Sequence, residues 1–80
     1  MVTAEVGSDV RIDCDVEGKP KPDIVWVKFD SSVDLSVLPN GTLVLQNIQQ
    51  EDSGTYQCFA LGKLMFSSNV TAVEKKGKVH

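Results

Sequence analysis

The chain has 80 residues and a formal net charge of −3 at pH 7. This length fits one small domain, which buries only about 60–65% of its unfolded surface and is expected to need a stabilising cross-link. The charge excludes a basic nucleic-acid-binding surface, and no apolar run reaches the roughly 18 residues that membrane insertion requires. Met1 is followed by polar, strand-like sequence and not by a signal peptide, so we interpret the chain as one module of a longer protein.

Three strands are predicted in the first half of the chain. Residues 2–6 predict a short strand, and residues 9–16 predict a half-buried strand whose even-numbered residues face the core. The acidic outer face of the second strand indicates solvation. A calcium site is the alternative, but same-face neighbours about 6–7 Å apart would need help from loops. A proline-rich turn at residues 17–23 leads to a third strand at residues 24–29, in which Trp26 faces the core.

Two short strands follow, joined by a turn. Residues 35–38 and 42–46 are separated by Asn40-Gly41, which is a two-residue hairpin signal and favours a type I′ turn with a positive φ at Asn40. Leu43 and Leu45 are expected to face the core, because apolar residues alternate along the second of these strands.

The segment 51–58 organises the rest of the chain. In its turn, Gly54 can adopt a positive φ and Asp52 can accept a backbone hydrogen bond. In the strand that follows, Tyr56 and Cys58 face the core. Their spacing of two residues is that of a tyrosine corner, in which the hydroxyl bonds back to the preceding turn.

The C-terminal part predicts one more strand. Residues 61–64 form a turn around Gly62-Lys63, and residues 65–73 form a strand with Met65 and Asn69 on its outer face. Residues 75–80 are expected to be a polar tail or linker; contact of its lysines with an acidic glycan is the alternative.

Cys14, Trp26 and the motif Asp52-x-Gly54-x-Tyr56-x-Cys58 together resemble the immunoglobulin superfamily, specifically its intermediate set. The resemblance implies an all-β, two-sheet sandwich of Greek-key topology with seven or eight strands, spanning residues 1–74. It also implies an inter-sheet disulfide between Cys14 and Cys58 that packs on Trp26. Strand A would be truncated, and the connection at residues 30–34 is too short for a variable-type domain.

One position departs from the family pattern. The resemblance implies an arginine that pairs with Asp52, and the matching position carries Asp34, while Arg11 lies on another strand. Because two carboxylates repel each other, we expect Asp52 to be partly solvated.

Catalytic residues are scarce in this sequence. The lone histidine is His80, so no Ser/His/Asp or Cys/His arrangement can form without the last residue. No zinc-binding spacing is present, and the glycines stand singly at turns. We therefore expect no enzyme activity, no cofactor and no metal.

Two features point to the cell exterior and to binding. Asn40-Gly41-Thr42 and Asn69-Val70-Thr71 are N-glycosylation sequons. The third, sixth and seventh family strands would also present an apolar outer face, since their inner positions are already filled. Its residues are Val25, Val27, Phe29, Phe59, Leu61 and Met65. Slippage of strand parity at a bulge, or coverage by the stems of polar side chains, is the alternative reading of this face.

The resemblance implies an extracellular, non-catalytic recognition or adhesion module of a multi-domain receptor, axon-guidance or matrix protein. Its partners would be a protein, homophilic or heterophilic, and the neighbouring immunoglobulin-like domains of the parent chain. A structural spacer in an intracellular muscle or cytoskeletal protein, with reduced cysteines and unused sequons, is the alternative.

Overall fold

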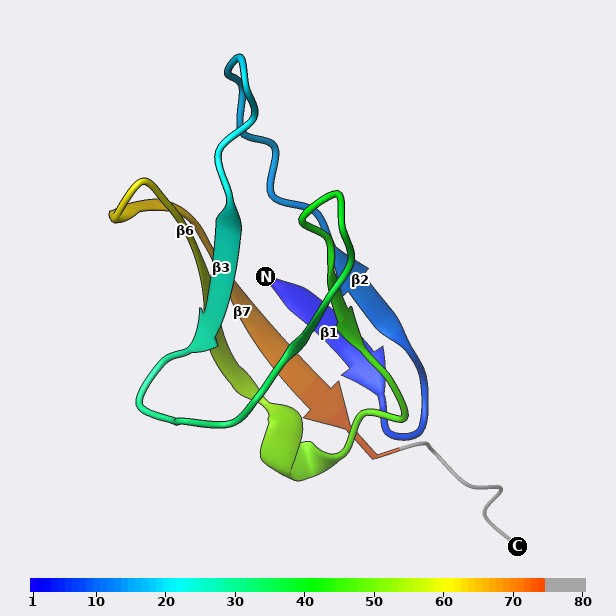
Figure 1. Cartoon of the computed structure of the whole chain (residues 1–80). Helices are drawn as coiled ribbons and strands as arrows, with labels where there is room; N and C mark the ends of the chain where they lie inside the picture. The colour runs from blue at the N-terminus through cyan, green and yellow to red at the C-terminus, as the bar shows by residue number, and fades with distance from the viewer. Residues whose placement is uncertain (75–80) are drawn as a thin grey trace, which may run out of the picture.

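The computed structural model describes residues 1–74 and shows two β-sheets packed face to face (Figure 1). The expected all-β sandwich is confirmed, with seven strands and one 3-10 turn in this part of the chain. In chain order these are β1 (Val2–Glu5), β2 (Val10–Ile12), β3 (Ile24–Lys28), β4 (Ser36–Val37), β5 (Leu43–Leu45), η1 (Gln50–Asp52), β6 (Gly54–Ala60) and β7 (Lys63–Val73).

The two sheets have the orders β1-β7-β6-β3 and β2-β5-β4. Strand β1 pairs parallel with β7, and the other neighbouring pairs are antiparallel. Figure 1 shows the 3-10 turn closing one end of the sandwich, where the chain passes from the smaller sheet into β6. The predicted placement of the third, sixth and seventh family strands in one sheet is therefore correct.

The core lies between the sheets and follows the predicted alternation. Leu43, Ile48 and Cys58 are completely buried, and Trp26 is 5% exposed. In the second predicted strand, pairing ends at Ile12, but the alternation of buried and exposed residues continues to Val16. Side-chain burial therefore extends further along this segment than its ladder of backbone hydrogen bonds.

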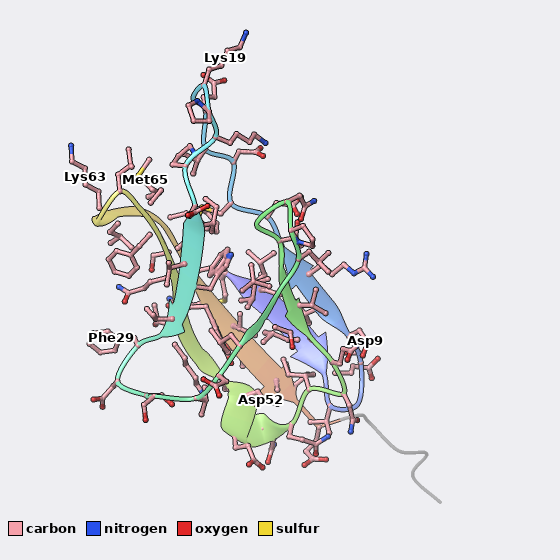
Figure 2. All side chains as sticks on the ribbon, in the orientation of Figure 1. Asp9, Lys19, Phe29, Asp52, Lys63 and Met65 are labelled. Atoms are coloured by element: carbon pink, nitrogen blue, oxygen red, sulfur yellow. A yellow bond between two sulfur atoms is a disulfide. The ribbon has the colours of Figure 1, made fainter. Side chains whose placement is uncertain are left out.

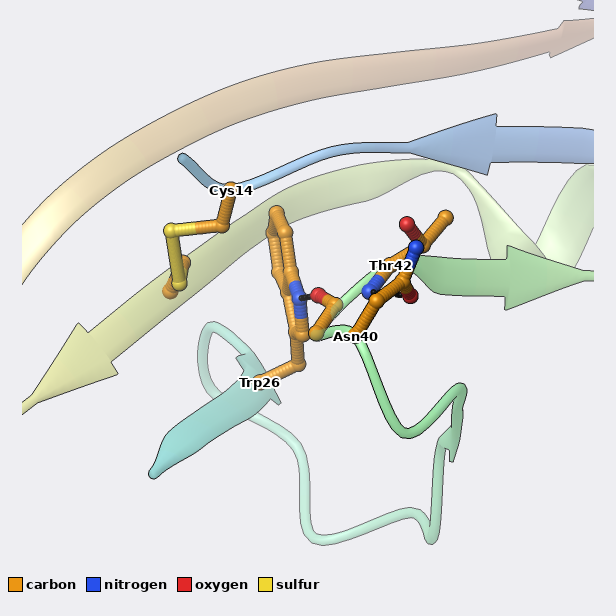
Figure 3. Close-up of a disulfide and its surroundings, with 6 residues drawn as sticks. Cys14, Trp26, Asn40 and Thr42 are labelled. Atoms are coloured by element: carbon orange, nitrogen blue, oxygen red, sulfur yellow. Dashed lines mark hydrogen bonds between the residues drawn. A yellow bond between two sulfur atoms is a disulfide. The ribbon is translucent and has the colours of Figure 1, made fainter. Parts of the chain in front are cut away.

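A disulfide joins the two layers, between Cys14 on the chain beyond β2 and Cys58 on β6. Trp26 is the cross-strand partner of Cys58, and its indole Nε1–H donates to the carbonyl oxygen of Gly41 at 2.8 Å (Figure 3). The bridge closes a loop with a sequence separation of 44, which corresponds to about 4 kcal/mol of stabilisation in the chain-entropy model.

Two turns differ from their predicted forms. The turn between β6 and β7 consists of Leu61-Gly62, both at positive φ, and not of Gly62-Lys63, because Lys63 already pairs with Ala60. The β4–β5 turn is a three-residue loop, since the N–H of Leu38 donates to the carbonyl of Thr42. There the positive φ belongs to Gly41, whereas Asn40 keeps a negative one.

A bulge interrupts the β6–β7 pairing. Cys58 lies opposite Phe66, and Phe59 lies opposite Leu64, so one extra residue, Met65, is inserted in β7. Such a bulge shifts the side-chain alternation of one strand relative to its neighbour. The strand-parity slip that the sequence left open therefore occurs, and it is confined to this end of β7.

Candidate functional site

The tyrosine corner forms as predicted and organises the end of the molecule that contains η1. The Tyr56 hydroxyl donates to the backbone oxygen of Asp52, and the Asp52 carboxylate accepts the N–H of Gln49 at 2.8 Å. Burial raises the pKa of the Tyr56 hydroxyl, and the negative charge of Asp52 raises it further. Asp52 is half-buried, in agreement with the expected partial solvation.

Lys28 lies beside this corner, which lacks the arginine that the family pattern implies at the position of Asp34. Its Nζ donates to the backbone oxygen of Glu51 at 2.6 Å and lies 5.9 Å from the centre of the Tyr56 ring, within cation–π range. Its stem also covers Gly54, where an added Cβ would come within 3.0 Å of Lys28 Cε. The ammonium of Lys28 is therefore directed along the end of the sandwich.

The outer face of β3, β6 and β7 carries exposed apolar side chains, and we call it the outer β3–β6–β7 face. Val25 is 55% exposed, Phe29 64%, Leu61 83% and Met65 48%, while Val27 and Phe59 are half-buried. Figure 2 shows Phe29 and Met65 on the same flank of the molecule, with Asp9 on the opposite flank. Val25 pairs directly with Phe59, so the half-buried residues link the exposed ones.

Two exposed apolar residues of this region were missed by the sequence reasoning. Leu64 is 51% exposed and belongs to the outer face, since it lies opposite Phe59. Phe66 is 43% exposed, but it lies opposite the inward-facing Cys58 and packs edge-on against Trp26, with ring centres 6.3 Å apart. Both placements follow from the bulge, which no residue type in the sequence marks.

Both sequon asparagines are exposed, and both make side-chain hydrogen bonds. The Asn40 Oδ1 accepts the N–H of Thr42 at 3.1 Å. Asn69 lies on the outer side of β7, where its Oδ1 accepts the hydroxyl of Thr55 at 2.7 Å. In each case the oxygen is engaged, and the amide nitrogen is the atom to which carbohydrate would be attached.

The acidic face beside β2 is used in separate hydrogen bonds. Asp9 accepts the backbone N–H of Asn47 at 2.9 Å, and Asp13 accepts the hydroxyl of Thr42 at 2.7 Å. In residues 1–74 no group of three or more His, Cys, Asp or Glu side chains is placed to hold a metal ion. His80 and the lysine-rich tail lie outside the described residues.

Among the described residues there is also no helix long and apolar enough to cross a membrane.

A two-sheet sandwich with an inter-sheet disulfide, a tryptophan packed beside it and a tyrosine corner defines an immunoglobulin-like domain. The sequence profile of the family described as "Immunoglobulin domain" matches residues 1–61, and the chain belongs to this family.

Similar proteins include human ADAMTS-like protein 3, which is 41% identical over 95% of this chain and 5% of its own length. The N-terminal Ig1-2 module of the Drosophila receptor protein tyrosine phosphatase DLAR is 31% identical. The match covers 89% of this chain and 40% of the DLAR chain, with a TM-score of 0.76. Extracellular domains 3–5 of Drosophila OTK are 29% identical and cover 95% of this chain and 28% of that one, with a TM-score of 0.68.

The chain thus spans only a small part of the curated relatives that it matches, 5% in the case of ADAMTS-like protein 3. In similar solved structures such as DLAR and Sidekick-1 the matching domain is one of two or more immunoglobulin domains in one chain. The similarity therefore concerns the module, and the activities of the whole relatives are separate from it.

Proposed function

We propose that this chain is a non-catalytic, extracellular protein-recognition module that docks through the outer β3–β6–β7 face. The observation that carries the proposal is the group of apolar side chains on this face. Its exposed members are Val25, Phe29, Leu61, Leu64 and Met65. Single exposed apolar residues are ordinary, but several on one face are typical of an interface, in which aromatic residues and Met are enriched.

The extracellular part of the proposal is supported by the cysteines and the sequons. The Cys14–Cys58 bridge requires an oxidising compartment to persist. Asn40 and Asn69 are exposed and available to the secretory glycosylation machinery. The similarity to OTK extracellular domains points in the same direction.

The two sequons differ in their relation to the docking face. Asn69 lies on the outer side of β7, so carbohydrate attached there would cover part of the proposed interface. Asn40 belongs to the β4–β5 turn of the other sheet, and carbohydrate there would leave the interface open. Docking is therefore compatible with a glycan at Asn40 and incompatible with full occupancy at Asn69.

The proposal can be tested by presenting the chain as a tetramer to an array of cell-surface and secreted ectodomains that includes the chain itself. Multivalent presentation makes weak single-site contacts detectable. We expect binding to at least one ectodomain to fall by roughly tenfold or more when Leu64→Lys places a charge on the face, because loss of a hot-spot contact costs about 2 kcal/mol or more.

Gln46→Lys is the matched control, since it adds the same charge at an exposed position next to β5 in the other sheet. Its binding should equal that of the parent chain, and both variants should keep the parent melting temperature. Binding that survives Leu64→Lys would contradict docking through this face, and a chain that binds nothing on the array would instead favour a structural spacer.

A further inference from the structure

Strand β3 forms a free edge of the larger sheet and has β6 as its neighbour on one side only. The N–H of Phe29 donates to the carbonyl of Thr55 on the β6 side at 2.7 Å. In an antiparallel pair, bonding residues alternate along the strand, so Val25 and Val27 also direct their backbone groups toward β6. The N–H and C=O groups of Ile24, Trp26 and Lys28 therefore point toward the free edge.

The other three sheet edges of residues 1–74 carry the features that usually prevent edge-to-edge pairing. Exposed Glu5 lies on β1, exposed Arg11 lies on β2, and β4 is only two residues long. Charged side chains and short strands are the ordinary protection of an edge. On β3 the outward positions 25 and 27 are both valine, and Phe29 follows them.

The one charge on β3 does not protect its edge. Lys28 faces the end of the sandwich, where its ammonium bonds to the Glu51 backbone oxygen and lies over the Tyr56 ring. Its position leaves the backbone groups of Ile24 and Trp26 accessible, whereas the Lys28 carbonyl already accepts the N–H of Ser31 at 3.1 Å. An unprotected edge strand whose outward side chains are apolar is a template for a further strand.

We propose that a second copy of this chain binds to the β3 edge, with the two β3 strands antiparallel and a two-fold axis passing next to Trp26. The two four-stranded sheets would then form one continuous sheet of eight strands. This inference rests on the proposed docking role of the outer β3–β6–β7 face, and it identifies a second copy of the chain as a binding partner.

The register explains why the partner is the same strand. Centring the two-fold axis on Trp26 pairs all five residues of β3, so that Ile24 lies opposite Lys28 of the second copy. On the outer face, Val25 then lies opposite the second copy's Val27 in both halves, and such apolar cross-strand pairs are favourable.

Lys28 takes no part in charge pairing across this edge, since its ammonium is held by the Glu51 backbone oxygen. The edge is thus complementary to itself in hydrogen bonding and in apolar contacts.

The test is sedimentation velocity of the purified chain from about 1 µM to about 1 mM, the range in which a small interface dissociates. We expect a reversible monomer–dimer equilibrium. Val25→Lys should weaken the association roughly tenfold or more, because it replaces two symmetric apolar pairs and adds a charge to the edge.

A double variant tests the register itself. In Val25→Lys/Val27→Glu, each Lys lies opposite a Glu of the second copy, so association should return toward the parent value. Thr3→Lys, which places the same charge on the exposed side of β1 at the other edge of this sheet, is the control and should associate like the parent.

Three results would overturn the inference: a monomer at every concentration, a dimer insensitive to Val25→Lys, or a double variant no better than Val25→Lys alone. A monomeric chain that still binds another ectodomain through Leu64 would remove the second copy as partner and leave the docking face in place. The self-association proposal and the docking proposal can therefore be refuted independently.

Discussion

Leu61 departs from local structural preference in two ways. It occupies the first position of the two-residue β6–β7 turn at φ 53°, and it is 83% exposed. Turns with two positive φ values favour Asn-Gly, because a Cβ at positive φ clashes with the backbone and Asn offsets this cost by local hydrogen bonds that leucine cannot make. Since neither folding nor solubility explains a leucine at this tip, its position fits a contact residue of the outer β3–β6–β7 face.

Replacing Leu61 should therefore have opposite effects on stability and on binding. We expect Leu61→Asn to raise the free energy of unfolding by about 0.5–1 kcal/mol, or the melting temperature by about 2–8 °C, while docking weakens. Denaturation in urea measures the first effect. Leu64→Asn is the control, since it removes a neighbouring leucine that has no positive φ and should give no gain in stability. A less stable Leu61→Asn chain would contradict the assigned strain.

At the scale of the elements, the alternation of apolar and polar residues was sufficient to predict which strands form and which side of each is buried. The core positions Trp26, Leu43, Leu45 and Tyr56 were predicted from this alternation, and all four are buried. Pairing between strands was less predictable, because it depends on register. The Met65 bulge and the position of the β6–β7 turn are set by long-range pairing and not by local preference.

The surroundings of Tyr56 illustrate the same limit. The sequence showed that the expected arginine is absent, but it could not identify Lys28 as the residue that lies over the corner. That role depends on the pairing of Lys28 with Tyr56 across β3 and β6, which is a consequence of register. The Tyr56-to-Asp52 hydrogen bond, in contrast, follows from the two-residue spacing between Tyr56 and Cys58.

Tyr56→Phe should lower the free energy of unfolding at neutral pH by about 1 kcal/mol, through loss of the hydrogen bond to the Asp52 carbonyl. The substitution should also change how the free energy of unfolding falls at alkaline pH. Because the pKa of Tyr56 is raised in the folded chain, its contribution is fully present below pH 10 and is lost as the pH rises through the folded-state value. Urea denaturation between about pH 7 and 12 should therefore show a steeper alkaline decline in the parent than in the variant. Parallel declines would contradict this role.

At the scale of the whole molecule, a disulfide and a side-chain hydrogen bond connect the two sheets at neighbouring positions. The disulfide connects Cys14 to Cys58, and the indole of Trp26 reaches across to the Gly41 carbonyl. A chain of this size has a small core, so these connections form a large share of a total stability of about 5–15 kcal/mol. The total stability therefore depends on the cellular compartment, since a reducing environment would open the disulfide.

We expect the chain secreted from eukaryotic cells to carry the closed disulfide and to resist thiol alkylation, with carbohydrate at Asn40. Reduction should then lower the melting temperature by roughly 20 °C, because about 4 kcal/mol of loop-closure stabilisation is lost. Intact mass before and after alkylation, and with Asn40→Gln as the glycan control, gives the covalent state. Two reactive thiols in a folded, unglycosylated chain would favour the intracellular spacer.

The packing of Trp26 beside the disulfide also makes the molecule its own optical reporter. The chain contains a single tryptophan, so all of its indole fluorescence comes from the interface between the two sheets. Figure 3 shows the disulfide beside the Trp26 indole, and since a disulfide can accept an electron from an excited indole, we expect the folded chain to emit weakly. We expect light emission to rise when the layers separate or when the bridge is opened, so that the integrity of the sandwich can be followed without any attached label.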